Sequence, residues 1–247
     1  MKAQGWRGVV DESVAAALGQ EQRSDPVLPG TGGPAGNARL TAWTGLVLLV
    51  LFVAELLTLL DVHGLIRWHL ALGVILVPPA LLKTGSTGWR ILRYYRGDRA
   101  YRQAGPPPLV LRVLGPLVVL GSLTLLGSGV ALVWLGEQRS RETLLTVVGP
   151  RVDMLTLHQA SFVLWAVVTG LHVLGRLLLA ARTAARGPGD VAGPVARGAL
   201  VVGSLVVAAL CAVLVLAHPG GWNHDDRFRP HDRDLTPPSA PGPTLAG

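Results

Sequence analysis

Long apolar segments alternate with shorter polar connections along most of this chain. Five of the segments come close to the roughly 20 residues that an α-helix needs to cross a bilayer. Because lipid offers no hydrogen bonds to exposed backbone groups, each segment is predicted to be a spanning α-helix. The segments cover residues 40–60, 65–83, 110–135, 154–178 and 198–217. We therefore expect an all-α integral membrane protein, with the lipid bilayer as its immediate surroundings.

The two ends of the chain are polar. Residues 1–38 mix charged residues with Gly and Pro and contain no apolar core. They predict a disordered cytoplasmic tail, neither a signal peptide nor a folded domain. Residues 218–247 are rich in Pro, Asp and Arg and predict a second polar tail, on the outer side. The expected organisation is one helical membrane domain, residues 39–217, between two tails.

Composition agrees with a membrane protein. Hydrophobic residues make up 50% of the 247 residues and charged residues 15%, which is too apolar for an ordinary soluble domain. The net charge of +7 does not predict nucleic-acid binding, because the arginines sit between apolar runs and not along one amphipathic face. The one cysteine, Cys211, excludes a disulfide framework. Arginine outnumbers lysine 20 to 2, a bias of GC-rich coding sequences that favours a bacterial source and hence the inner membrane.

The charges of the connections predict the orientation. Connections 83–112 and 176–197 together hold eleven basic and two acidic residues. Connections 61–67 and 136–153 together hold four of each. Positively charged loops stay in the cytoplasm. We therefore expect the N-terminus inside and the C-terminus outside.

The fourth segment carries two histidines, His158 and His172, and few other polar residues. Fourteen residues of helix leave them about 40° apart around the axis and about 21 Å apart along it. Ionisable residues within a membrane are costly, so they are candidates for function. A neutral imidazole can bind a metal through one nitrogen while the other makes a hydrogen bond.

A haem iron takes one axial ligand from each side, so His158 needs a partner on another helix at the same depth. His69 meets this requirement, because both histidines lie about five residues inside the outer ends of their helices. Arg67 and Arg151 lie just above them and are predicted partners for haem propionates. The alternative is that each histidine only makes hydrogen bonds between helices.

A His-x13-His pattern on one membrane helix, facing a histidine on another, resembles the di-haem b-type cytochromes. This group includes cytochrome b561, the membrane subunits of formate dehydrogenase and hydrogenase, and ferric reductases. The resemblance covers residues 40–217 and implies a four-helix core that binds haem b. It implies that His158 and His172 are ligands on the paired helix and that His69 is the outer ligand opposite. It also implies electron transfer between a quinone or cytoplasmic donor and an outer acceptor.

The chain departs from this pattern at the inner site. Lys83 stands fourteen residues after His69, where a full di-haem pattern has a fourth histidine. His172 therefore faces a haem with Lys83 opposite, or a haem with one open side, or no haem. A lysine can ligate only when neutral, and a lysine at a helix end normally extends its ammonium to the interface. We expect one haem b, and a second haem at the inner site is the alternative.

Other residues add alternatives. Glu55 lies at the depth of His69, where it would either accept a proton from a quinol or pair with Arg67. His63 and His218 lie at the outer edge, and His63 is a reserve haem ligand. The C-terminal tail either is solvated or binds a divalent cation. The tail residues that would bind the cation are His224, Asp225, Asp226 and His231.

Glycines recur along the third segment, and they either make room for a flat macrocycle or serve plain helix packing. These glycines are Gly115, Gly121, Gly127 and Gly129.

No flavin or nicotinamide fingerprint occurs in the sequence. The function we expect is therefore that of an electron carrier that works with a partner oxidoreductase subunit, with a quinone as a candidate donor. The alternative is a haem-free membrane scaffold or transporter subunit, in which the histidines join helices or relay protons.

Overall fold

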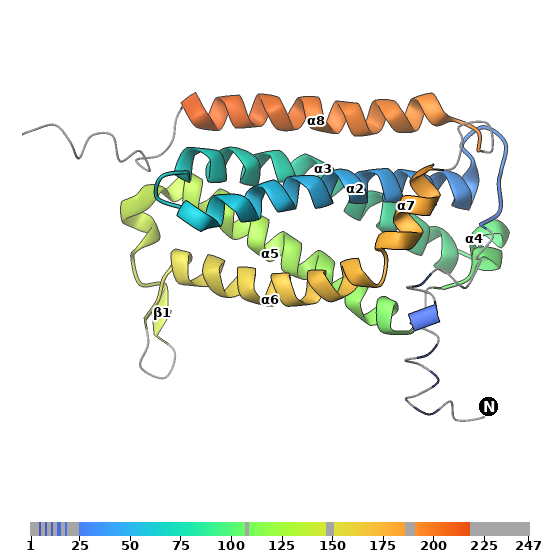
Figure 1. Cartoon of the computed structure of the whole chain (residues 1–247), viewed down its shortest axis with the longest axis horizontal. Coiled ribbons are helices and arrows are strands. Elements are labelled where there is room, and N and C mark those ends of the chain that lie inside the picture. Colours follow the sequence, from blue (N-terminus) through green and yellow to red (C-terminus); the bar gives the residue numbers. More distant parts are fainter. Residues whose placement is uncertain are drawn as a thin grey trace, which may run out of the picture.

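Five long helices dominate the computed structural model, and each is long and apolar enough to cross a membrane (Figure 1). The structure describes residues 25–106, 109–146, 151–185 and 191–217, with a few positions before residue 25. The long helices are α2 (Gly33–Thr58), α3 (Ile66–Tyr95), α5 (Leu109–Ser140), α6 (Met154–Leu174) and α8 (Pro194–Ala217). The predicted all-α, multi-pass membrane fold is thereby confirmed.

Short elements join the long helices. A 3-10 turn, η1 (Leu59–Asp61), follows α2, and the helix α4 (Arg99–Ala104) follows α3. The strands β1 (Leu145–Thr146) and β2 (Arg151–Val152) pair in antiparallel fashion between α5 and α6. The helix α7 (Leu177–Ala185) follows α6.

Several boundaries differ from the predicted ones, those of α2, α3 and α6 among them. Helix α2 begins at Gly33 and not at residue 40, because Pro34 in its first turn has a backbone angle suited to a helix start. Residues 33–38 therefore belong to the helical domain and not to the N-terminal tail. Helix α3 continues past residue 83 to Tyr95. The segment predicted as 154–178 is divided, since α6 ends at Leu174 and α7 begins at Leu177.

Four of the long helices form two packed pairs. Helix α2 packs along α3, α5 packs along α6, and α3 also contacts α5. Helix α8 packs mainly on α3, as an outer layer on the side away from α5 and α6 (Figure 1). The arrangement is thus a four-helix core of α2, α3, α5 and α6, with a fifth helix outside it.

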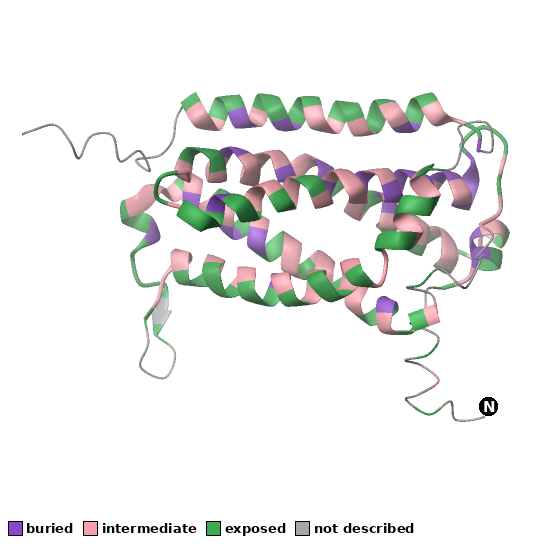
Figure 2. Cartoon of the chain, in the orientation of Figure 1, coloured by how far each residue is buried: buried purple, intermediate pink, exposed green. Residues whose placement is uncertain are grey.

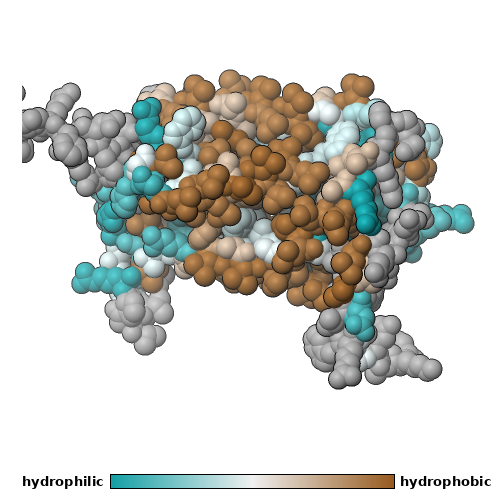
Figure 3. All heavy atoms as spheres, viewed as in Figure 1, coloured by the Kyte–Doolittle hydropathy of each residue, from teal (hydrophilic) through white to brown (hydrophobic). Residues whose placement is uncertain are grey.

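The face of the molecule seen in Figure 3 is mostly apolar between two polar ends. Many large apolar side chains are exposed along the helices, such as Val206, Leu210 and Leu214 of α8. Buried residues are few, and they lie where one helix faces another (Figure 2). An exposed apolar belt of this kind suits lipid, because lipid tails and aliphatic side chains have the same polarity.

A buried arginine ties the starts of two helices together at the end that carries α4 and α7. Arg197 of α8 is 5% exposed and donates hydrogen bonds to the carbonyls of Val191, Ala192 and Thr31. Gly36 of α2 permits this approach, because a Cβ there would lie 2.9 Å from the Arg197 guanidinium. The start of α2 is therefore anchored on the start of α8.

The start of α6 is set by a side-chain cap. The Asp153 carboxylate accepts a hydrogen bond of 2.7 Å from the Thr156 backbone N–H, which satisfies a free amide of the first turn. This hydrogen bond lowers the pKa of Asp153 below its ordinary value. The cap lies about one turn before His158 and so fixes where the helix that carries this histidine begins.

Candidate functional site

A cavity of about 460 Å³ lies inside the four-helix core, between the α2–α3 pair and the α5–α6 pair. All four helices contribute to its wall, and its volume is in the range of small-molecule and cofactor sites. The wall is mostly apolar. Its ionisable and amide side chains are those of Glu55, His63, His69, Glu137, Arg141, His158 and Gln159.

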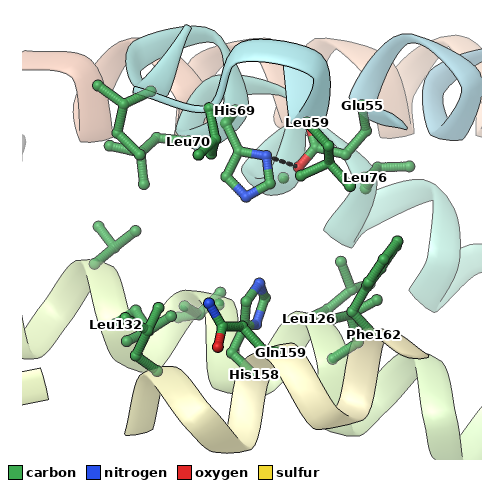
Figure 4. Close-up of a pocket in the computed structure, with 18 of the residues that line it drawn as sticks. Glu55, Leu59, His69, Leu70, Leu76, Leu126, Leu132, His158, Gln159 and Phe162 are labelled. Carbon is green, nitrogen blue, oxygen red and sulfur yellow. Dashed lines mark ion pairs between the residues drawn. The ribbon is translucent and has the colours of Figure 1, made fainter. Parts of the chain in front are cut away.

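His69 and His158 face each other across this cavity (Figure 4). His69 comes from α3 and His158 from α6, and their ring centroids are 6.5 Å apart with an angle of 81° between the ring planes. The two histidines that the sequence places at equal depth are therefore brought together by the fold. Two ligands on opposite sides of one metal can turn about their shared axis, so the angle between their planes does not hinder ligation.

The hydrogen bonds of His69 identify the nitrogen that is free to bind. Its Nδ1 lies 3.0 Å from Glu55 Oε1 and 3.0 Å from Thr58 Oγ1. The Thr58 hydroxyl already donates its hydrogen to the Glu55 backbone carbonyl at 2.6 Å. A hydroxyl has one hydrogen to donate, so toward the His69 ring the Thr58 oxygen can only accept. Nδ1 of His69 must therefore be the donor, which leaves Nε2 with its lone pair toward the cavity.

His158 is held in the same tautomer by a different group. Its Nδ1 lies 3.0 Å from the Ser128 hydroxyl, and that hydroxyl donates to the Leu125 carbonyl at 2.9 Å. A hydroxyl has one hydrogen to donate, so the Nδ1 of His158 is again the donor. The adjacent Gly129 makes room for the ring, since a Cβ there would lie 3.2 Å from His158 Cε1.

The separation of the rings suits a metal between them. A metal–imidazole bond is about 2 Å, and the ring centre lies about 1 Å behind the nitrogen, so two opposed imidazoles have centroids about 6 Å apart. Two neutral imidazoles supply only two ligands. Within the described residues, no group of three or more His, Cys, Asp or Glu side chains is placed to hold a metal ion. Two opposed imidazoles are the ligands that a haem iron can take from a protein, one from each side.

An aromatic cluster forms part of the cavity wall. Trp165 of α6 is 4% exposed, and its Nε1 donates a hydrogen bond of 2.9 Å to Ser122 of α5. The Trp165 ring lies 4.5 Å from Phe52 and 6.3 Å from Phe162, measured between centroids. Trp165 packs over Gly121, where a Cβ would lie 3.5 Å away. These flat, apolar side chains suit a flat, apolar ligand.

The predicted propionate partners do not line the cavity. Arg67 and Arg151 are both exposed, and the arginine in the wall is Arg141. Arg141 lies 3.3 Å from the Glu137 carboxylate, which also lines the cavity. The pairing of Arg67 and Arg151 with propionates stays a prediction, and Arg141 is the residue that the sequence did not indicate.

The inner pair of candidates is arranged differently. Helix α3 continues to Tyr95, so Lys83 lies within the helix and not at its end. Its ammonium donates a hydrogen bond of 3.0 Å to the Thr41 carbonyl of α2. Nδ1 of His172 is buried and has no hydrogen-bond partner within the part of the chain that the structure describes. A second haem at His172 stays a prediction.

No family model, curated protein or solved structure matches this chain. The resemblance to b-type cytochromes therefore depends on the residues and their geometry. Of the remaining candidates, His63 lines the cavity. His218 and the predicted cation-binding residues of the tail, His224, Asp225, Asp226 and His231, lie outside the described residues.

Proposed function

We propose that this protein is a b-type cytochrome, with one haem b between His69 and His158. The observation that carries the proposal is the pair of facing imidazoles, 6.5 Å apart, with both Nδ1 atoms occupied by hydrogen bonds. Two lone pairs that face each other inside an apolar wall repel unless an electron acceptor lies between them. A haem iron is such an acceptor, and it takes one imidazole from each side.

The side chains around the site have separate tasks in this proposal. Haem b supplies one-electron oxidation and reduction when it is bound. Glu55 and Thr58 hold the ring of His69, and Ser128 holds the ring of His158, so each Nε2 is fixed toward the cavity. Trp165 and its aromatic neighbours exclude water from the inner wall. Arg141, at the wall beside Glu137, supplies a guanidinium that can donate hydrogen bonds to the acidic groups of the ligand.

The partners follow from the absence of any other redox motif in the sequence. We propose that the protein passes electrons between a quinone pool or membrane donor and a partner oxidoreductase subunit, in the inner membrane of a bacterium. It is then a non-catalytic subunit of a larger oxidoreductase.

An optical spectrum tests the proposal directly. The protein purified in mild detergent, from cells supplied with a haem precursor, is expected to give a reduced-minus-oxidised difference spectrum of the b type. The expected haem-to-protein ratio is about one, because one cavity holds one pair of facing histidines. A purified, folded protein without these bands would contradict the cytochrome proposal.

The second candidate function is the haem-free one. The close pair of His69 and Glu55, 3.0 Å apart and mostly buried, is an arrangement that also suits a proton relay within the membrane. The same spectrum distinguishes the two candidates, since a proton relay or helix scaffold has no haem bands.

The orientation of the chain gives a further prediction. The cavity lies at the end of the core that carries η1 and the β1–β2 hairpin, and α4 and α7 lie at the opposite, basic end (Figure 1). A reporter fused after residue 247 is expected to be active outside the membrane, and one fused near residue 100 inside, because basic connections stay in the cytoplasm. If the reporter after residue 247 is active inside and the one near residue 100 outside, the predicted orientation is wrong and the cavity lies near the cytoplasm.

A further inference from the structure

The two facing histidines have chemically different partners. His69 donates to the carboxylate of Glu55 at 3.0 Å, and His158 donates to the hydroxyl of Ser128 at 3.0 Å. Both partners lie inside the core: the Glu55 side chain is 15% exposed, and Ser128 is 6% exposed. The site thus has one carboxylate and one neutral hydroxyl as supporting groups.

The Glu55 carboxylate affects the basicity of the His69 nitrogen that faces the cavity. Its Oε1 accepts from His69, and its Oε2 is buried with no hydrogen-bond partner within the described residues. A hydrogen bond to a charged acceptor is roughly twice as strong as one between neutral groups. A carboxylate behind a ligating histidine also raises the basicity of that histidine. A hydroxyl, which is neutral and already donates to the Leu125 carbonyl, has a weaker effect of the same kind.

We propose that Glu55 is a positioning residue that makes His69 the stronger of two unequal axial ligands and lowers the reduction potential of the haem. The inference rests on the proposed function. Oxidised haem iron carries one more positive charge than reduced iron. A negative charge one imidazole away therefore stabilises the oxidised form more, and the effect is larger in an apolar interior than in water.

A redox titration of three proteins at one fixed pH tests this proposal. They are the native protein, Glu55→Gln and Ser128→Ala. Glutamine has the size of glutamate and an amide oxygen that can still accept the His69 hydrogen bond, so it removes the charge and keeps the geometry. Ser128→Ala removes the hydrogen bond on the opposite ligand without a change of charge and serves as the matched control.

We expect Glu55→Gln to keep the haem and to shift the oxidised-to-reduced ratio at a set potential about tenfold toward the reduced form. For a one-electron couple this is about 59 mV. Ser128→Ala is expected to shift the ratio by about twofold or less. A visible or electron paramagnetic resonance spectrum that changes in Glu55→Gln and not in Ser128→Ala would show that the ligand field itself has changed.

Other outcomes are decisive too. Equal shifts in the two variants would show that His69 and His158 are equivalent ligands. So would a Glu55→Gln protein whose oxidised-to-reduced ratio lies within twofold of the native value. Either result would overturn the proposed role of Glu55 and leave the cytochrome proposal intact. Loss of haem from Glu55→Gln alone would support the proposal, because it would show that Glu55 strengthens haem binding by His69 more than Ser128 strengthens binding by His158. Equal loss of haem from both variants would overturn it. A native protein without haem would instead contradict the proposed function itself.

Discussion

Replacement of either facing histidine, in His69→Ala or His158→Ala, is expected to abolish haem binding. In the proposed site each imidazole would hold the iron from one side, and one remaining imidazole would hold it much more weakly. The measurement is the haem-to-protein ratio of the purified variants, taken from their optical spectra. The ratio is expected to fall from about one to below about one tenth in both.

The matched control is His172→Ala, on the same helix as His158 but outside the cavity wall. This variant is expected to keep a ratio of about one. Full haem content in both His69→Ala and His158→Ala would mean that another residue is the ligand, with His63 of the cavity wall as the next candidate. A native ratio of about two that falls only in His172→Ala would restore a second, inner haem and give Lys83 no part in it.

Gly129→Leu is expected to prevent haem binding sterically, without removing a ligand. A Cβ at this position would already lie 3.2 Å from the His158 ring, and the rest of a leucine side chain would extend into the cavity that Gly129 lines. We expect the haem-to-protein ratio to fall at least about tenfold, because a filled core space tolerates little added volume.

Gly127→Leu is the control for this experiment. Gly127 lies on the same helix, and nothing lies within 4 Å of a Cβ built there. Both changes replace glycine with a better helix former, so a general effect on α5 would appear in both variants. Gly127→Leu is expected to bind haem normally. Similar haem contents in the two leucine variants would show that Gly129 does not border the ligand.

The hydrophobic pattern predicted the number and approximate place of the long helices, because the thickness of a bilayer sets the length of an apolar helix. It missed the length of α3. Beyond Lys83 the sequence becomes polar, yet the helix continues to Tyr95, since a helix that leaves the membrane can satisfy its own backbone in water. Hydropathy reports the lipid-covered part of a helix and not its end.

The pairing of His69 with His158 could be predicted because depth depends only on the position of a residue along its helix. The two hydroxyls that contact them, on Thr58 and Ser128, could not. Thr58 lies eleven residues before His69, and Ser128 lies thirty residues before His158. Which residues of α2 and α5 face a given histidine depends on the rotation of each helix about its axis, and one sequence contains no measure of that rotation.

Arg141 was missed for a related reason. Helix α5 bends at Gly136, whose φ of 74° and ψ of 172° are not helical. Glu137 and Arg141, which follow the bend, both reach the cavity wall. The helix predicted from the sequence ends before these residues. The sequence therefore indicated Arg67 and Arg151, which do not line the cavity.

The off-centre position of the cavity bears on how this protein would interact with the membrane potential. Leu174, at the far end of α6, lies sixteen residues after His158, which is about 24 Å of helix. An electron that enters and leaves a single haem at the depth of His158 does not travel this distance. Moving one charge across the full membrane involves about 2.3 kcal/mol per 100 mV. Turnover at this site alone would therefore do little electrical work, and its rate would depend only weakly on the voltage across the bilayer.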